Sequence, residues 1–212
     1  MSMMSMIGKV AMGMVVAKVT NSMMGGKSSS GGGIADMLGG LLGGSKNDTS
    51  SSQGGGIGDL LSGLTGSKPT TSNDNGLGGL LLAALAGKEV KNATPTQEEQ
   101  AKVLLKAMIN AAKADGQIDK SEQAKIVEHV GDVTAEELAF VQSEMAAPLD
   151  LEGVIANANG IEAEVYLSSL MTINLDSKEE ALYLDKLAKG LNISEEAADA
   201  FHVKLGVPKL YS

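Results

Sequence analysis

The sequence predicts an all-α protein: a bundle of seven helices over residues 94–212, preceded by a glycine-rich half, residues 1–93, that is partly helical or disordered. Apolar residues recur at helical spacing through the second half, and most of these stretches begin at a capping signature. No segment alternates apolar and polar residues as a half-buried strand would. Short connections favour antiparallel neighbours around one core.

The first helix of this bundle shows the pattern most clearly. In "TPTQEEQAKVLLKAMINAAKADG", Thr96 followed by Glu99 predicts a capping box. One continuous stripe, typical of a helix face, is formed by Ala101, Leu104, Leu105, Met108, Ile109 and Ala112. Further starts are predicted at Asp119 with Glu122, Thr134 with Glu137, Pro148, Gly160, Asp176 with Glu179 or Ser177 with Glu180, and Ser194.

Composition separates the two halves. Residues 1–93 hold 21 of the 27 glycines and a net charge of +2, whereas residues 94–212 carry a net charge of −11. There is no cysteine, which excludes disulfides, thiol catalysis and thiolate metal sites. All 17 cations are lysine and only five residues are aromatic, which argues against nucleic-acid binding. We therefore expect residues 96–207 to fold alone as a soluble helical domain.

Residues 1–24 are apolar apart from Lys9, Lys18 and small polar residues. The lysines interrupt the run, and a spanning helix needs about 20 apolar residues. No convincing signal-peptide cleavage site follows. Two interpretations are open: a helix lying on a membrane surface, and a methionine-rich helix packed on another protein.

A short repeat follows. "GGGIADMLGGLLGG" (31–44) is echoed by "GGGIGDLLSGLTG" (54–66) and more loosely by "GLGGLLLAALAG" (76–87). Each apolar piece is too short and too rich in glycine to form a stable helix alone in water. The pieces need a membrane, a partner or each other; the alternative is a disordered tether.

The stretch "NAAKADGQIDKSEQ" is similar to the second half of a calcium-binding EF-hand loop. Ala111 and Lys113 stand where the first two oxygen ligands would be, so a helix-to-helix turn is favoured, with Gly116 ending one helix in the left-handed conformation. The alternative is a looser divalent-metal site. Its ligands would be Asp115, Asp119 and Glu122, joined by Asp176 and Glu180 from an echoed apolar-Asp-x-x-Glu turn 57 residues later.

A family resemblance rests on "LLKAMINAAKADGQIDKSEQAKI" and "AEVYLSSLMTINLDSKEEALYLDKLAKGLNIS". Over residues 77–207 the chain resembles the TerB-like superfamily of tellurite-resistance-associated helical domains and, more narrowly, the YebE-like inner-membrane family. The resemblance implies a seven-helix fold and a Gly/Leu segment associated with the inner membrane. It also implies, for some relatives, acidic metal ligands. In this chain these map to Asp115, Asp119, Glu122, Asp176 and Glu180.

No enzyme signature is present. His129 and His202 stand alone on helices, where a surface or half-buried position is expected, and Glu162 with Glu164 is expected to form a solvated edge. "MMGGKSSS" lacks the spacing of a phosphate-binding loop.

These observations predict a non-enzymatic, membrane-associated interaction module that binds a membrane or membrane-protein partner. A divalent ion is its one candidate cofactor. A link to envelope or stress response is expected. The expected location is the bacterial inner membrane, with the helical domain in the cytoplasm. The alternative is a structural subunit of a large or homo-oligomeric assembly, cytoplasmic or within a larger complex, whose glycine-rich repeats pack on partner subunits.

Overall fold

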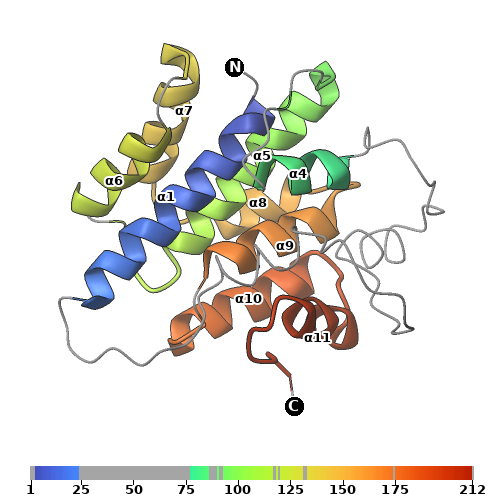
Figure 1. The fold of residues 1–212 in the computed structure, drawn as a ribbon. Coiled ribbons are helices and arrows are strands. Elements are labelled where there is room, and N and C mark those ends of the chain that lie inside the picture. Colours follow the sequence, from blue (N-terminus) through green and yellow to red (C-terminus); the bar gives the residue numbers. More distant parts are fainter. Residues whose placement is uncertain are drawn as a thin grey trace, which may run out of the picture.

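Every regular element in the described part of the chain is an α-helix. The computed structural model describes residues 3–23, 77–85, 90, 93–116, 118, 120–130, 133–173 and 175–211. These ranges contain nine helices and no strand, so the all-α prediction is confirmed for them (Figure 1). The helices are α1 (Met3–Met23), α4 (Leu77–Leu85), α5 (Pro95–Ala112), α6 (Lys120–Val130), α7 (Ala135–Ala146), α8 (Leu151–Ala156), α9 (Glu162–Thr172), α10 (Lys178–Gly190) and α11 (Glu195–Lys204).

Several helix starts follow the predicted caps. The Thr134 hydroxyl accepts the Glu137 N–H of α7, and the Glu137 carboxylate accepts the Thr134 N–H, which completes a capping box. The Ser194 hydroxyl likewise accepts the Ala197 N–H and caps α11. These side chains satisfy amide groups that have no partner within the helix.

The capping box predicted at Thr96 and Glu99 is wrong. Helix α5 begins two residues earlier, with Thr94 as the N-cap and Gln97 as its reciprocal partner. Pro95 explains the shift, because proline lacks an N–H and its fixed φ suits the first helical position.

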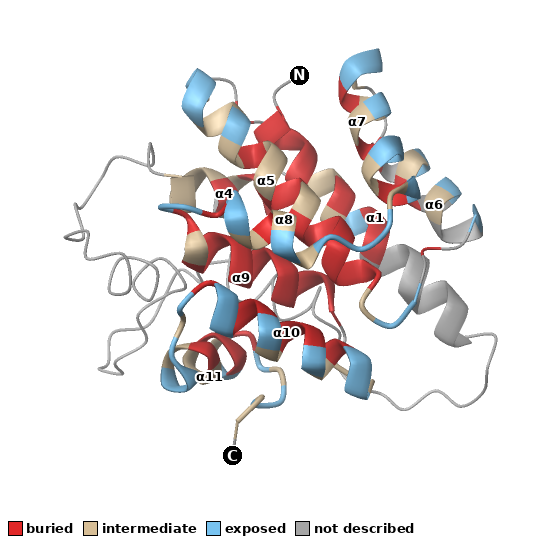
Figure 2. Cartoon of the chain, turned by 180° about the vertical axis from the view of Figure 1, so that it is seen from behind, coloured by how far each residue is buried: buried red, intermediate tan, exposed pale blue. Residues whose placement is uncertain are grey.

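Helices α5 and α9 form the centre of the body: α9 is buried almost throughout, and α5 buries half of its residues, all from Ala101 onward (Figure 2). Helix α1 packs against α4, α5 and α6, and Figure 1 places it between the α6–α7 pair and the rest of the body. Helix α6 contacts α1 more extensively than any other helix. The N-terminal helix is therefore part of the same hydrophobic core as the predicted bundle.

Helix α1 buries a methionine-rich face. Met4, Ile7 and Val10 are completely buried, whereas Met12 on the opposite side is 54% exposed. Unbranched, polarisable methionine side chains fill irregular gaps between helices. The sequence left two alternatives for this helix, a membrane surface and another protein. The structure shows a third arrangement, in which the methionine-rich helix packs on its own chain.

Helices α1 and α4 approach each other unusually closely. A Cβ atom placed on Gly8 would lie 1.8 Å from the carbonyl oxygen of Ala84, so only glycine fits there. Close by, the Ser5 hydroxyl accepts the N–H of Val90 at 2.9 Å and donates to its carbonyl at 3.3 Å. Helix α4 is the third copy of the apolar repeat; the copies at 31–44 and 54–66 lie outside the described residues.

None of the helices in the described ranges is both long enough and apolar enough to cross a membrane.

Candidate functional site

The two echoed acidic turns emerge at the same end of the body. The Thr172 hydroxyl, at the last residue of α9, donates to the Met108 carbonyl one turn before the end of α5. Helices α5 and α9 therefore run side by side and in the same direction, as Figure 1 also shows. The turn that follows α5 and the turn that follows α9 therefore leave the same end of this helix pair, which a shared site would need.

The first turn differs from the predicted one. Helix α5 ends at Ala112, and residues 113–115 form a tight turn closed by the Gly116 N–H, which donates to the Lys113 carbonyl at 3.0 Å. Gly116 has a φ of 153°, outside the left-handed helical conformation that was predicted for it. The helix already ends four residues earlier, at Ala112, so Gly116 redirects the chain rather than caps α5.

The second turn is built around a buried carboxylate. The Ser177 hydroxyl caps α10, and the fully buried Glu180 carboxylate accepts the N–H groups of Asp176 and Ser177 at 3.1 and 3.3 Å. Of the two predicted starts for this helix, Ser177 with Glu180 is the one observed. Leu175, just before the turn, has a φ of 51°, which is uncommon for a residue with a side chain.

The five predicted metal ligands are only partly described. Asp115 and Asp176 are exposed in the two turns, and Glu180 is buried in its capping box. Asp119 and the side chain of Glu122 lie outside the described residues. Within the described ranges no group of three acidic, histidine or cysteine side chains is placed to hold a metal ion. The metal site stays a prediction.

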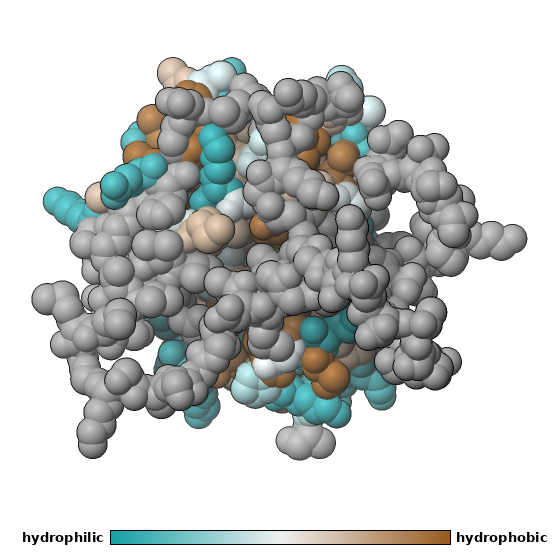
Figure 3. Space-filling model, viewed as in Figure 1, coloured by the Kyte–Doolittle hydropathy of each residue, from teal (hydrophilic) through white to brown (hydrophobic). Residues whose placement is uncertain are grey.

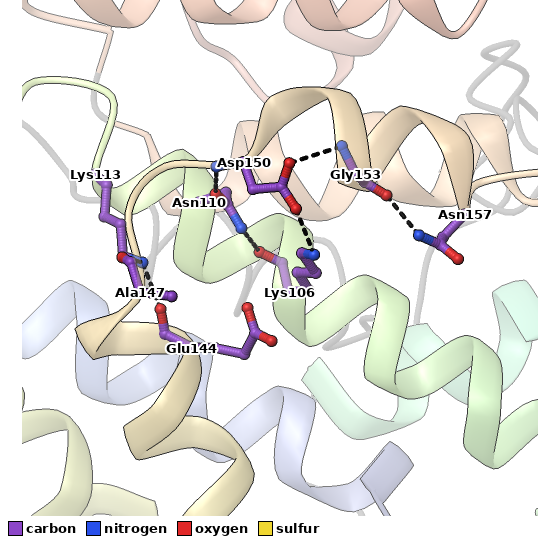
Figure 4. Close-up of polar contacts among 8 residues, drawn as sticks. All are labelled: Lys106, Asn110, Lys113, Glu144, Ala147, Asp150, Gly153 and Asn157. Carbon is purple, nitrogen blue, oxygen red and sulfur yellow. Dashed lines mark hydrogen bonds and ion pairs between the residues drawn. The ribbon is translucent and has the colours of Figure 1, made fainter.

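A polar network that the sequence analysis did not find joins α5 to the corner between α7 and α8 (Figure 4). It starts from Lys106, Asn110 and Lys113, which lie one turn apart on one side of α5. Helical spacing alone could have suggested this row. However, lysine and asparagine on an apolar helix are ordinarily assigned to solvent.

Lys113 is 3% exposed, and its ammonium group donates to the carbonyl oxygens of Glu144 and Ala147 at the end of α7. These carbonyls carry the negative end of the helix dipole and have no partner within the helix. Burial lowers the pKa of Lys113 from its ordinary value, and the nearby Glu144 carboxylate opposes that shift. The lysine acts as a C-terminal cap supplied by another helix.

Asn110 and Lys106 fix the start of α8. The Asn110 side chain accepts the Asp150 N–H at 2.6 Å and donates to the Lys106 carbonyl at 2.8 Å. Lys106 pairs with the Asp150 carboxylate at 2.7 Å, and the same carboxylate accepts the Gly153 N–H as the N-cap of α8. The hydrogen bond from Lys106 holds the pKa of Asp150 below its usual range. The network positions the α7–α8 corner and presents no reactive group.

Two expectations about buried groups are wrong. His202 is completely buried rather than at the surface or half-buried, and it is hydrogen-bonded to Tyr166 and to the carbonyl of Pro208. Glu164 is 5% exposed rather than solvated, and burial raises its pKa. Its Oε2 atom has no hydrogen-bond partner in the described part of the chain. Glu164 is buried because α9 is covered on nearly every side. His202 is buried because α11 turns it toward Tyr166 of α9.

A comparison with protein families gives one match that covers all nine helices described above. Residues 2–205 match the family described as "Protein of unknown function (DUF533)". The chain belongs to this family. The DUF533 match runs from α1 to the end of α11, so it includes α1 and α4 together with α5 to α11. Neither the curated proteins nor the solved structures compared with the chain give a significant match.

Proposed function

We propose that this DUF533 protein is a non-enzymatic interaction module that holds a glycine-rich, apolar-repeat segment against the bacterial inner membrane. The observation that carries the proposal is how the ends of the segment are fixed. Residues 24–76 leave the body after α1 and return to it at α4, and these two helices are packed together through Gly8 and Ala84. The segment is thus attached at both ends to helices of the same body.

The chemistry of the segment supports an apolar rather than an electrostatic attachment. Residues 24–76 contain three lysines and four aspartates, a net charge of −1, so they offer no basic patch for anionic lipids. Their apolar side chains are gathered in the two repeats, at Ile34, Met37, Leu38, Leu41 and Leu42, and at Ile57, Leu60, Leu61 and Leu64. Because the two repeats are linked within one chain that is attached to the body at both ends, we propose that they bind one surface together.

The TerB-like and YebE-like resemblance fits this proposal, because it associates a Gly/Leu segment with the inner membrane. We extend the proposal to a divalent ion held between the two neighbouring turns, by Asp115, Asp119 and Glu122 with Asp176 and Glu180. The proposed role of the ion is to fix the turns, because apposed carboxylates repel each other without a cation.

Vesicle flotation tests the membrane proposal. The full chain is mixed with neutral and with anionic lipid vesicles and centrifuged through a density gradient. We expect it to float with both, since attachment is apolar. A matched variant carries serine at Leu41, Leu42, Leu60 and Leu61 and should stay at the bottom with an unchanged melting temperature.

Failure to float with either vesicle type, or equal flotation of the serine variant, would contradict the proposal. A chain that does not float but elutes from gentle lysis in a large complex instead supports the alternative, a structural subunit of an assembly. Detergent separates the two cases, because a membrane-bound chain is released by it and an assembly subunit still sediments with its complex.

A further inference from the structure

Residues 207–211, near the end of the sequence, fold back onto α10 and α11. Gly206, with a φ of 65°, turns the chain at the end of α11. The Gly206 and Val207 N–H groups donate to the carbonyls of Val203 and His202, which is the Schellman arrangement for a helix end. The five residues that follow Gly206, "VPKLY", are called the C-terminal segment below.

Side chains on two helices bind this segment mainly through its backbone. One oxygen of the Asp199 carboxylate accepts the N–H groups of both Leu210 and Tyr211, each at 3.1 Å. The Tyr211 hydroxyl donates to the Asp185 carboxylate of α10 at 3.0 Å. Lys209 lies 3.9 Å from Asp199, which matches a basic side chain to an acidic site.

The buried His202 also binds the backbone of the segment. Its Nδ1 atom lies 2.5 Å from the Pro208 carbonyl, and a carbonyl only accepts, so Nδ1 carries the proton. The Nε2 atom of the neutral ring is then an acceptor, and the Tyr166 hydroxyl donates to it at 3.0 Å. Helix α9 thus fixes the orientation of the ring that binds the segment.

The segment is held by these polar contacts together with apolar packing, since Val207, Leu210 and Tyr211 are partly buried against the hydrophobic core. None of its five side chains is buried, and Pro208 and Lys209 are exposed. The groups that bind it are in place on α9, α10 and α11, and the surface around α10 and α11 is mostly hydrophilic in Figure 3. Backbone N–H and carbonyl groups are what this site recognises, together with one tyrosine hydroxyl.

We propose that Asp185, Asp199 and His202 form a peptide-docking site that the chain's own C-terminal segment keeps closed. When the segment detaches at Gly206, the site accepts the same segment from a second copy of the chain. The family match ends at residue 205, so the docking residues lie within the matched body and the segment is an extension beyond it. The exchange would link two copies, with the C-terminal segment of one bound in the docking site of the other, and the helices would stay in place.

Competition with a synthetic peptide tests this on the full chain. The probe is a fluorescent peptide with the sequence of residues 206–212, and the readout is fluorescence anisotropy. In the Leu210→Pro chain, proline removes one of the two N–H groups that Asp199 binds, so the chain's own segment no longer closes the site. We expect this variant to bind the peptide at least about tenfold more tightly than the wild type, because a closed site lowers apparent affinity by the fraction that is open.

Two controls make the test specific. Adding Asp199→Asn to the Leu210→Pro chain should abolish the gain, and a peptide with phenylalanine in place of its tyrosine should bind more weakly, since it lacks the hydroxyl for Asp185. Equal, weak binding to the wild type and to the Leu210→Pro chain would overturn the proposal.

Hydrogen exchange in the wild-type chain gives an independent check that requires no variant. We expect the amides of Leu210 and Tyr211 to exchange faster than those of α9 under conditions where the chain stays folded. If they exchange as slowly as the α9 amides, the segment opens only when the whole protein unfolds, and the docking-site proposal is wrong.

Discussion

The N-terminal and C-terminal sides of the body are stabilised by different kinds of interaction. On the N-terminal side, α1 packs on α4, α5 and α6 mainly through methionine and aliphatic side chains. Hydrogen bonds from the Met3 N–H to Glu98 and between Ser5 and Val90 are among its polar contacts. On the C-terminal side, directional hydrogen bonds add to the apolar packing of α9, α10 and α11. Tyr166 of α9 bonds to His202 of α11, and Asp185, Asp199 and His202 bind the C-terminal segment. Both sides share one hydrophobic core.

This difference predicts how each side responds to change. Apolar packing is strong but tolerates substitutions that keep volume, whereas a buried polar network fixes one arrangement and leaves a costly unpaired group when one member is removed. The N-terminal side should therefore be sensitive to shape, and the C-terminal side to chemistry and pH.

The largest expected effect is at Met4, which is completely buried. Met4→Ala should lower the free energy of unfolding by about 2–5 kcal/mol, because it removes buried apolar surface and leaves a cavity. Denaturant unfolding of the full chain measures this. Met12→Ala on the exposed side of the same helix is the matched control and should have little effect. Equal small effects at both positions would show that α1 is not part of the core.

Gly8→Ala sharpens the same comparison. In an exposed helix this change would stabilise by about 1 kcal/mol through helix propensity. Here the new methyl group would overlap the Ala84 carbonyl, so we expect a net loss of about 1–3 kcal/mol as α1 and α4 are forced apart. Denaturant unfolding measures the change in midpoint relative to the wild type. A higher midpoint for Gly8→Ala would contradict the close contact between α1 and α4.

His202 makes the C-terminal side sensitive to acid. Burial lowers its pKa, and the Pro208 carbonyl and the Asp199 carboxylate oppose that shift. Below about pH 6.5 the unfolded chain therefore takes up a proton that the folded chain resists, so stability falls as the pH drops. Melting temperatures between pH 8 and pH 5 measure this. His202→Gln should be less stable at pH 8 and should lose the part of the pH dependence that belongs to the ring.

The smallest effect is expected at the acidic turns without metal. Asp115 is exposed, so Asp115→Asn should change the free energy of unfolding by less than about 0.5 kcal/mol. Titration calorimetry with calcium, magnesium or zinc then tests the proposed ion. Heat of binding that Asp119→Asn abolishes would support a metal between the turns, and a flat titration would remove it.

Local signals in the sequence located much of the helical body. Thr134 with Glu137 and Ser194 mark helix starts because a capping side chain acts within one turn of the chain. The start of α5 was misplaced because "TPTQEE" offers two overlapping boxes, and Pro95 selects the first. The start of α10 falls one residue later than a strict repeat of the first turn, because Ser177 rather than Asp176 becomes the cap.

Contacts between distant segments could not be predicted in this way. No local sequence pattern indicates that α1 covers α6, that Lys113 caps α7, or that Asp199 binds the N–H groups of Leu210 and Tyr211. Glu164 and His202 were assigned to the surface because their residue types usually lie there. The position of α9 at the centre of the body and the contact of α11 with it, which only the folded chain reveals, reverse these assignments.

The central claim is that α1 is an integral part of the body rather than an appendage, although composition places a boundary near residue 94. Amide hydrogen exchange of α6, compared between the full chain and a 94–212 fragment, tests it most directly, because α6 contacts α1 more than any other helix. We predict that the fragment loses protection throughout α6 while α9 and α10 keep theirs. Equal protection of α6 in the fragment and in the full chain would contradict the claim and support an independent domain.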